Sequence, residues 1–168
     1  MDANSDVWHR LSGGTDCPLC VPRAEFDANV YRVRQLTSCT LYLARDQRYR
    51  GACRAIYDRR HVNRIDELTA AEWQQLAQDL WRAQQAIVRT VRCDHLNLAS
   101  LGNEVPHLHW HLIPRYRDDG RWGQPIWRAD AVPDAPRHLA QPQYAALAAA
   151  LNEALDAELA TPPITGPR

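Results

Sequence analysis

Hydrophobic residues in the middle of the chain recur at steps of three and four, which is the spacing of one face of an α-helix. The stretch Thr69-Ala-Ala-Glu72 before them fits a capping box, in which a hydroxyl and a carboxylate satisfy each other's unpaired backbone amides. We therefore predict an amphipathic helix over about residues 69–92, which needs a sheet to cover its apolar face. The positions on that face are Trp73, Leu76, Leu80, Ala83, Ile87 and Val91.

Runs typical of β-strands lie on both sides of this helix. Before it, the best are residues 40–43 and 53–57, separated by a polar turn at 45–47. After it, residues 95–101 and 107–114 are predicted strands, joined by a turn over 102–106. The simplest arrangement is a sheet with the helix packed on it.

A last helix is predicted over about residues 143–159. Tyr144, Leu147, Leu151 and Leu155 share one of its faces. It must end before Pro162-Pro163, which cannot continue a helix.

The composition is that of one ordinary globular domain. The chain has 168 residues, of which 45% are hydrophobic and 24% charged, with 20 basic and 20 acidic side chains. This balance gives no reason to expect nucleic acid as a partner, and no apolar run approaches the ~20 residues of a membrane span. The acidic start, residues 1–6, argues against a secretory or transit signal, so we expect a cytoplasmic protein.

The cysteine and lysine content narrows the chemistry. All basic residues are Arg, which excludes a lysine Schiff base and a P-loop lysine. The five cysteines argue against a disulfide framework. Cys17-x-x-Cys20 is half of a tetrahedral zinc site and needs two more ligands; the alternative is a pair of reduced thiols at a turn. We expect the remaining cysteines, Cys39, Cys53 and Cys93, to pack as small hydrophobic residues.

The most informative segment is His107-Leu-His-Trp-His111. In a strand, alternation places the three histidines on one face and Leu108, Trp110 and Leu112 on the other. Neighbouring imidazoles would lie ~7 Å apart. Such a row suits a phosphate chain or a metal ion.

This segment resembles the His-φ-His-φ-His-φ-φ signature (φ, hydrophobic) of the histidine triad family of nucleotide hydrolases and transferases. The resemblance extends upstream through residues 96–106 and downstream through Pro114-Arg-Tyr116, and more weakly over 17–61. It suggests a histidine triad domain over 17–127, a flexible N-terminal arm over 1–16, and a C-terminal extension with a helix over 128–168. It implies an α+β fold, with about five antiparallel strands and a packed helix, and a homodimer whose sheets are continuous.

The resemblance also implies a mechanism. His109, the middle histidine, would attack the α-phosphate of a nucleotide derivative and form a covalent nucleotidyl-histidine that water then hydrolyses. His111 would bind phosphate oxygens or protonate the leaving group. Further phosphate contacts are expected from the turn, at Ser100, Gly102 and Asn103. Because His111 stands where the transferase branch has Gln, the resemblance favours hydrolysis.

A metal site is implied as well. In the zinc-binding, bacterial-type branch, the two cysteines are joined by a histidine after the second long strand and by the first triad histidine. The matching residues are Cys17, Cys20, His61 and His107. Such a closed site would hold zinc in a structural role, although some family members lack the metal.

Two other functions remain open. One is nucleotidyl transfer or phosphorolysis, and the other is a non-catalytic, zinc-stabilised nucleotide-binding dimer in which His109 is idle. For Trp122 and Trp127 two interpretations are open. They could contact a nucleotide base or a partner subunit, or they could cover the edge of the sheet. The arginines of residues 45–64 and 115–128 alternate with Asp, which is typical of solvated faces.

Overall fold

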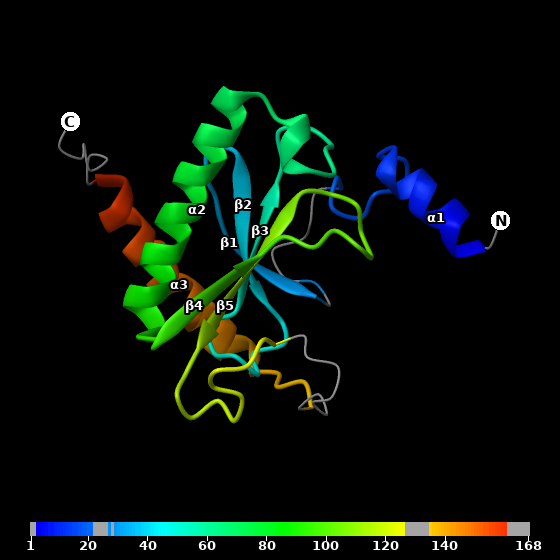
Figure 1. Cartoon of the computed structure of the whole chain (residues 1–168). Coiled ribbons are helices and arrows are strands. Elements are labelled where there is room, and N and C mark those ends of the chain that lie inside the picture. Colours follow the sequence, from blue (N-terminus) through cyan, green and yellow to red (C-terminus); the bar gives the residue numbers. More distant parts are fainter. Residues whose placement is uncertain (1–2, 22–26, 28, 127–134, 161–168) are drawn as a thin grey trace.

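The computed structural model describes residues 3–21, 27, 29–126 and 135–160, and its centre is one five-stranded sheet (Figure 1). The order of the strands is β1-β2-β3-β5-β4, and every neighbouring pair is antiparallel. This confirms the predicted α+β class and sheet. The strands are β1 (Val30–Gln35), β2 (Cys39–Ala44), β3 (Cys53–Tyr57), β4 (His95–Ala99) and β5 (His109–Arg115).

The long helix α2 (Ala70–Val91) begins where the sequence predicts. The Thr69 hydroxyl accepts a hydrogen bond from the Glu72 amide, and the Glu72 carboxylate accepts one from the Thr69 amide. The helix ends at Arg92, whose φ of 50° is left-handed. Trp73 is the exception on the predicted buried face: it is 38% exposed and stacks on Trp110 of β5.

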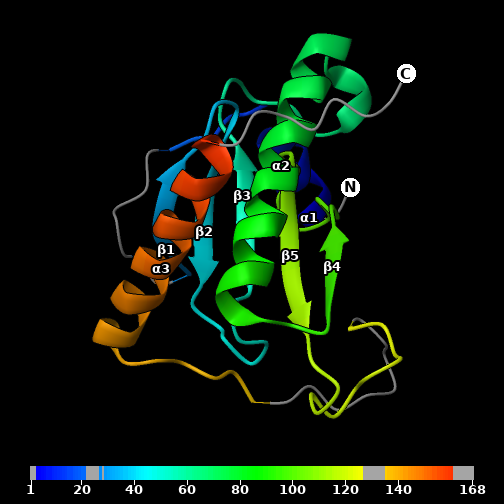
Figure 2. The same cartoon turned by 90° about the vertical axis from the view of Figure 1, so that its left-hand side faces the viewer.

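Helix α2 and the C-terminal helix α3 (Gln141–Ala160) cover the same face of the sheet (Figure 2). Helix α3 packs on α2 and on β1. Its side chains Tyr144, Ala148, Leu151 and Leu155 are buried in the same hydrophobic core as the sheet and α2. The helix is therefore part of the domain's core rather than an appendage, because it covers apolar surface of β1 and α2 that would otherwise meet water. The predicted boundary at residues 127 and 128 lies outside the described residues.

The opposite face of the sheet is not covered by these helices. Cross-strand partners share a face, and the pairs Arg54–His111 and Ile56–His109 place four side chains on this one. Trp110 and Leu112 point to the helix side and are buried. The sequence pattern predicts that the triad strand begins at His107, but β5 begins only at His109. Just before it, the Leu108 amide donates to the Val62 carbonyl, and the Leu108 carbonyl accepts from the amide of Tyr57, the last residue of β3.

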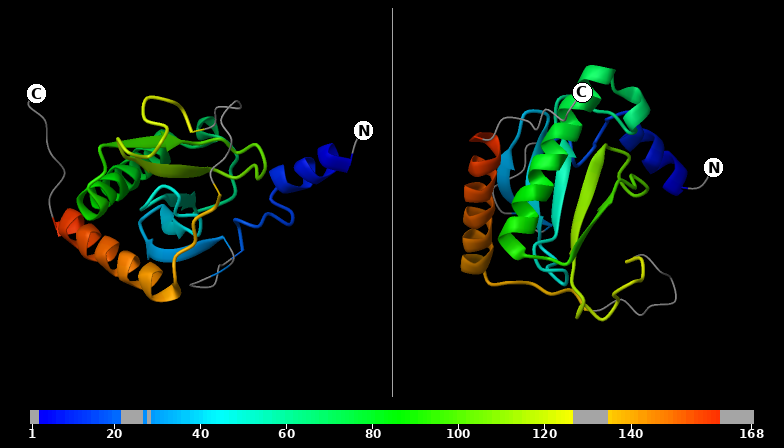
Figure 3. Two further views of the ribbon diagram at one scale, coloured as in Figure 1. Left: turned by 90° about the horizontal axis from the view of Figure 1, so that it is seen from below. Right: turned by 60° about the vertical axis from the view of Figure 1, so that its left-hand side comes forward.

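The N-terminal segment, expected as an arm, contains a helix that the sequence pattern did not predict. Residues Ala3–Ser12 form helix α1, which lies on the other side of the sheet from α2 and α3 (Figures 1 and 3). The helix ends at Gly13-Gly14, where Gly14 has a φ of 83°. The sequence pattern missed α1 because this helix buries little: Val7 and Trp8 are each 43% exposed. None of the described helices has both the length and the hydropathy needed to cross a membrane.

Candidate active site and metal centre

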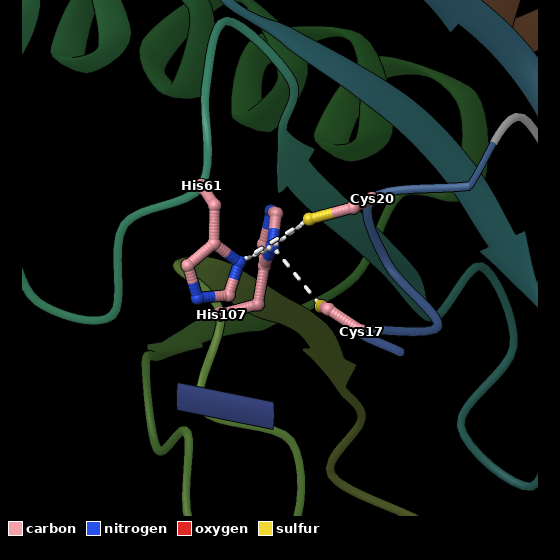
Figure 4. A group of neighbouring side chains, drawn as sticks. All are labelled: Cys17, Cys20, His61 and His107. Atoms are coloured by element: carbon pink, nitrogen blue, oxygen red, sulfur yellow. Dashed lines mark hydrogen bonds between the residues drawn. The ribbon is translucent and has the colours of Figure 1, made fainter. Parts of the chain in front are cut away.

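Four side chains converge from three separate parts of the chain (Figure 4). Cys17 and Cys20 follow α1, His61 follows β3, and His107 precedes β5. Their ligand atoms all lie within 4.8 Å of one another. These are the four residues expected as metal ligands, and they lie close enough to bind one ion.

The two imidazoles of this cluster are held by backbone carbonyls. His107 Nε2 lies 2.7 Å from the Tyr57 carbonyl oxygen and His61 Nε2 lies 3.1 Å from that of Ser12. Because a carbonyl only accepts, each Nε2 carries the proton and each Nδ1 presents its lone pair. The two Nδ1 atoms are 3.3 Å apart, and Cys20 Sγ lies 3.2 Å from that of His61.

This donor set suits a cation. Two nitrogen lone pairs that face each other repel unless a positive charge lies between them. Without one, partial burial and the neighbouring Cys17 thiol raise the pKa of Cys20 to about 11. The two sulfurs and the two carbonyl-oriented imidazoles are the ligand types found in Cys₂His₂ metal sites.

The middle histidine is oriented by the same segment of backbone. His109 Nδ1 lies 2.6 Å from the carbonyl oxygen of His107. The proton is therefore on Nδ1, and Nε2 keeps a lone pair that can attack an electrophile. The His109 and His111 rings are neighbours, with centroids 5.1 Å apart, closer than the predicted spacing.

Both of these histidines are neutral near pH 7. Burial lowers the pKa of His109, and the positive charge of Arg54 lowers it further. Burial, His109 and Arg54 together lower the pKa of His111 to about 4. An uncharged imidazole is the form that can act as a nucleophile.

The two rings line a cavity of about 470 Å³ on the open face of the sheet. Gly102 and Asn103, predicted phosphate contacts, also line it. Gly102 has a φ of 66°, a conformation that favours glycine and turns the chain toward the rings. The cavity is further lined by Pro18, Leu19, Asn29, Arg54, Ile56, Leu101, Glu104 and Val105.

Some of the predicted site residues lie elsewhere. Ser100 is exposed after β4 and is not among the residues that line this cavity. Trp122 lines a separate cavity of about 540 Å³ with His95 and Arg115. Trp127 lies outside the described residues.

Sequence reasoning missed Arg54. Its neighbourhood of alternating Arg and Asp predicts a solvated face, yet Arg54 lines the cavity beside His111. The signal was present in part, since alternation puts Arg54 and Ile56 on the same face of the predicted strand. What the pattern lacked was the register that pairs this strand with the triad.

Comparison with known proteins places the chain in a family. The family model of the HIT domain matches residues 26–118. No curated protein sequence matches the chain.

Several solved structures share the fold. A histidine triad protein from Bradyrhizobium japonicum superposes with a TM-score of 0.70 at 24% identity, over 82% of this chain and 99% of that one. One from Marinobacter aquaeolei gives 0.68 at 25% identity, over 77% and 91%. A zinc-bound histidine triad family protein from Mycobacterium smegmatis gives 0.54 at 19%, over 79% and 88%. With His109 and His111 in one cavity and a family model that matches more than half of its length, this chain belongs to the HIT domain family.

Proposed function

We propose that this protein hydrolyses a phosphoramidate or phosphoanhydride of a nucleoside monophosphate at the α-phosphate. His109 Nε2 forms a bond to phosphorus, and the leaving group departs with the electron pair of its own bond and takes a proton from water. Water then attacks phosphorus, the phosphorus–nitrogen bond breaks, and His109 regains its lone pair. The mononucleotide is released and the proton goes to solvent.

One observation carries this proposal: the hydrogen bond between His109 Nδ1 and the His107 carbonyl. It fixes the tautomer, and it stabilises the positive charge that the ring acquires when Nε2 bonds to phosphorus. A second base is not needed, because the nucleophile is already deprotonated at the attacking atom.

The rest of the cavity suits the rest of such a substrate. His111, neutral at pH 7, has one ring N–H with which to donate to a phosphate oxygen. The backbone amides of Gly102 and Asn103 are further donors. The apolar side chains Leu19 and Ile56 offer a surface for the nucleoside.

We propose zinc as the ion of the four-ligand cluster, in a structural role. The cluster uses His107 Nδ1, so the ion competes with neither His109 nor His111. This donor set supports membership in the zinc-binding branch of the family. Because the thiols of Cys17 and Cys20 must stay reduced to bind zinc, a reducing compartment such as the cytoplasm suits the protein.

We also propose a homodimer that forms along β4. The two edges of the sheet are β1 and β4. The β1 edge is packed by α3 and carries Arg32 and Arg34, and such charges discourage strand pairing. On β4, Leu98 points to the helix side, as its core partner Leu112 does, yet it is 40% exposed. A second copy paired at β4 would cover it.

The reaction is tested by incubating the protein with adenosine and guanosine 5′-phosphoramidates and quenching in the first turnover. Mass spectrometry should detect a nucleotidyl adduct on His109 and released mononucleotide. His109→Ala should abolish both while zinc content and circular dichroism stay unchanged. His95→Ala, an exposed histidine of β4, is the matched control.

Other outcomes identify the alternatives. A nucleoside diphosphate that appears when orthophosphate is added indicates phosphorolysis. Nucleotide binding without adduct or turnover indicates a binding module in which His109 is idle.

A further inference from the structure

The cavity contains a basic residue to which the mechanism above gives no task. Arg54, in the middle of β3, is the only arginine among the described residues that line it. Its cross-strand partner on β5 is His111, so the Cβ atoms of the two lie ~4.5–5.5 Å apart on the same face.

Arg54 carries the permanent positive charge of the described lining. His111 is neutral at pH 7 and adds no positive charge. Glu104, the acidic residue among the described lining, lies on the turn after β4. A phosphate near the triad therefore meets the permanent positive charge of this lining on β3.

Apolar and charged side chains follow one another along β3 in the cavity lining. His109 is the cross-strand partner of Ile56, and Ile56 lines the cavity together with Leu19. Arg54 lies two residues along β3 on the same face, beside His111. A nucleoside on Leu19 and Ile56 would have its 5′-phosphate near Arg54.

We propose, on the basis of the proposed function, that Arg54 binds the non-bridging oxygens of the phosphate that His109 attacks. The planar guanidinium matches two phosphate oxygens at once, which a lysine ammonium does not. Arg54 thereby restricts the site to negatively charged phosphorus esters and sets its preference for a nucleotide over the parent nucleoside.

The test measures equilibrium binding of AMP, GMP and the corresponding nucleosides by calorimetry. Arg54→Gln should weaken binding of the nucleotide roughly 10- to 100-fold, the range of one charge-assisted hydrogen-bonded contact. Nucleoside binding should change less than twofold. The nucleotide affinity of Arg54→Lys should lie between those of Arg54→Gln and the wild type, because lysine keeps the positive charge but lacks the planar guanidinium that binds two oxygens at once. Arg117→Gln removes a charge from a side chain that is 80% exposed, and should bind like the wild type.

Three outcomes overturn the inference. The first is that Arg54→Gln binds the nucleotide as tightly as the wild type does. The second is that Arg54→Gln loses affinity for the nucleotide and the nucleoside by the same factor, which indicates a structural role for Arg54. The third is a wild type that binds nucleotide no better than nucleoside. If Arg54→Gln fails to fold, the comparison of Arg54→Lys with the wild type decides. Because the readout is binding, a failure to form the His109 adduct would refute the proposed hydrolysis and leave this result standing.

Discussion

His107 takes part in both halves of the site through different atoms. Its Nδ1 faces the cysteine sulfurs, its Nε2 bonds to the Tyr57 carbonyl, and its own carbonyl accepts from His109. A change at His107 therefore alters both metal binding and the tautomer of His109. His109 and His111 depend on their surroundings in a simpler way, because burial holds them neutral.

The low pKa of His111 makes stability depend on pH. Its pKa is about 4 in the folded chain against 6.5 when unperturbed, so between these values the unfolded chain binds more protons. Stability is therefore highest above about pH 6.5 and falls as the pH drops toward 4. Urea titrations at several pH values should show this fall, and His111→Gln should reduce it because glutamine does not titrate. An equally steep fall in the variant, or an NMR titration of His111 near pH 6.5, would contradict the prediction.

The elements are joined by close contacts at their ends. The loop between β2 and β3 passes over the last residue of α2, where a Cβ on Gly51 would lie 2.6 Å from Val91 Cγ1. Gly51 also has a φ of 84°, so the position requires glycine on both counts. Nearer the start of α2, the buried carboxylate of Asp79 accepts hydrogen bonds from the amide and hydroxyl of Ser38. These contacts fix the position of the helix on the sheet.

At Gly51, the cost of the packing clash can be measured separately from the cost of the backbone conformation, by comparison with Gly120. Gly120 has a φ of 73°, and a Cβ added there would have nothing within 4 Å, so Gly120→Ala carries only the backbone cost, ~1–2 kcal/mol. Gly51→Ala adds the clash with Val91 and should lower the free energy of unfolding by a further ~1–3 kcal/mol. Chemical denaturation of both variants measures the difference. Equal losses in the two would show that the loop does not pack tightly on α2.

Across the molecule, the four-ligand cluster joins the N-terminal segment to the sheet. Cys17 and Cys20 belong to the segment after α1, whereas His61 and His107 belong to the loops around β3 and β5. The carbonyl of Ser12, at the end of α1, accepts hydrogen bonds from His61 and Asn63. Metal binding and the position of α1 should therefore be linked.

Removal of the metal should loosen the N-terminal segment. We expect one zinc per chain in the wild type and none in Cys17→Ser, measured by elemental analysis. Trypsin should then cleave after Arg10 in the variant faster than in the wild type, because α1 loses its attachment. Cys93→Ser, outside the cluster, should match the wild type in both measurements. A native protein without metal would refute the zinc assignment.

The proposed dimer is tested at the exposed edge of the sheet. Leu98→Arg places a charge on the apolar side of β4 and should convert the dimer to a monomer in analytical ultracentrifugation, because a buried unpaired charge is costly. Gln35→Arg, at the exposed end of the β1 edge, should leave the dimer intact. A monomeric wild type, or a dimer that survives in Leu98→Arg, would exclude pairing at β4.

Elements with local signals could be predicted from the sequence. Period-3.6 spacing and the capping box of Thr69 and Glu72 defined α2, because both depend only on near neighbours. The triad motif, through its family resemblance, also predicted the class of fold and the four ligands that the structure brings together. Local patterns failed where the cause is not local. Helix α1 has no strong apolar face, and β5 begins two residues after His107, next to a bond between the Leu108 amide and the distant Val62 carbonyl.

The set of side chains that share the cavity depends on how the strands pair. The register of β3 against β5 places Arg54 beside His111, and a slip of one residue would turn Arg54 to the helix side. The same register brings Ile56 in beside His109, while Ser100, beyond the end of β4, stays outside. Register is set by how the whole sheet buries its apolar face against α2 and α3, and no segment of the sequence contains that information on its own.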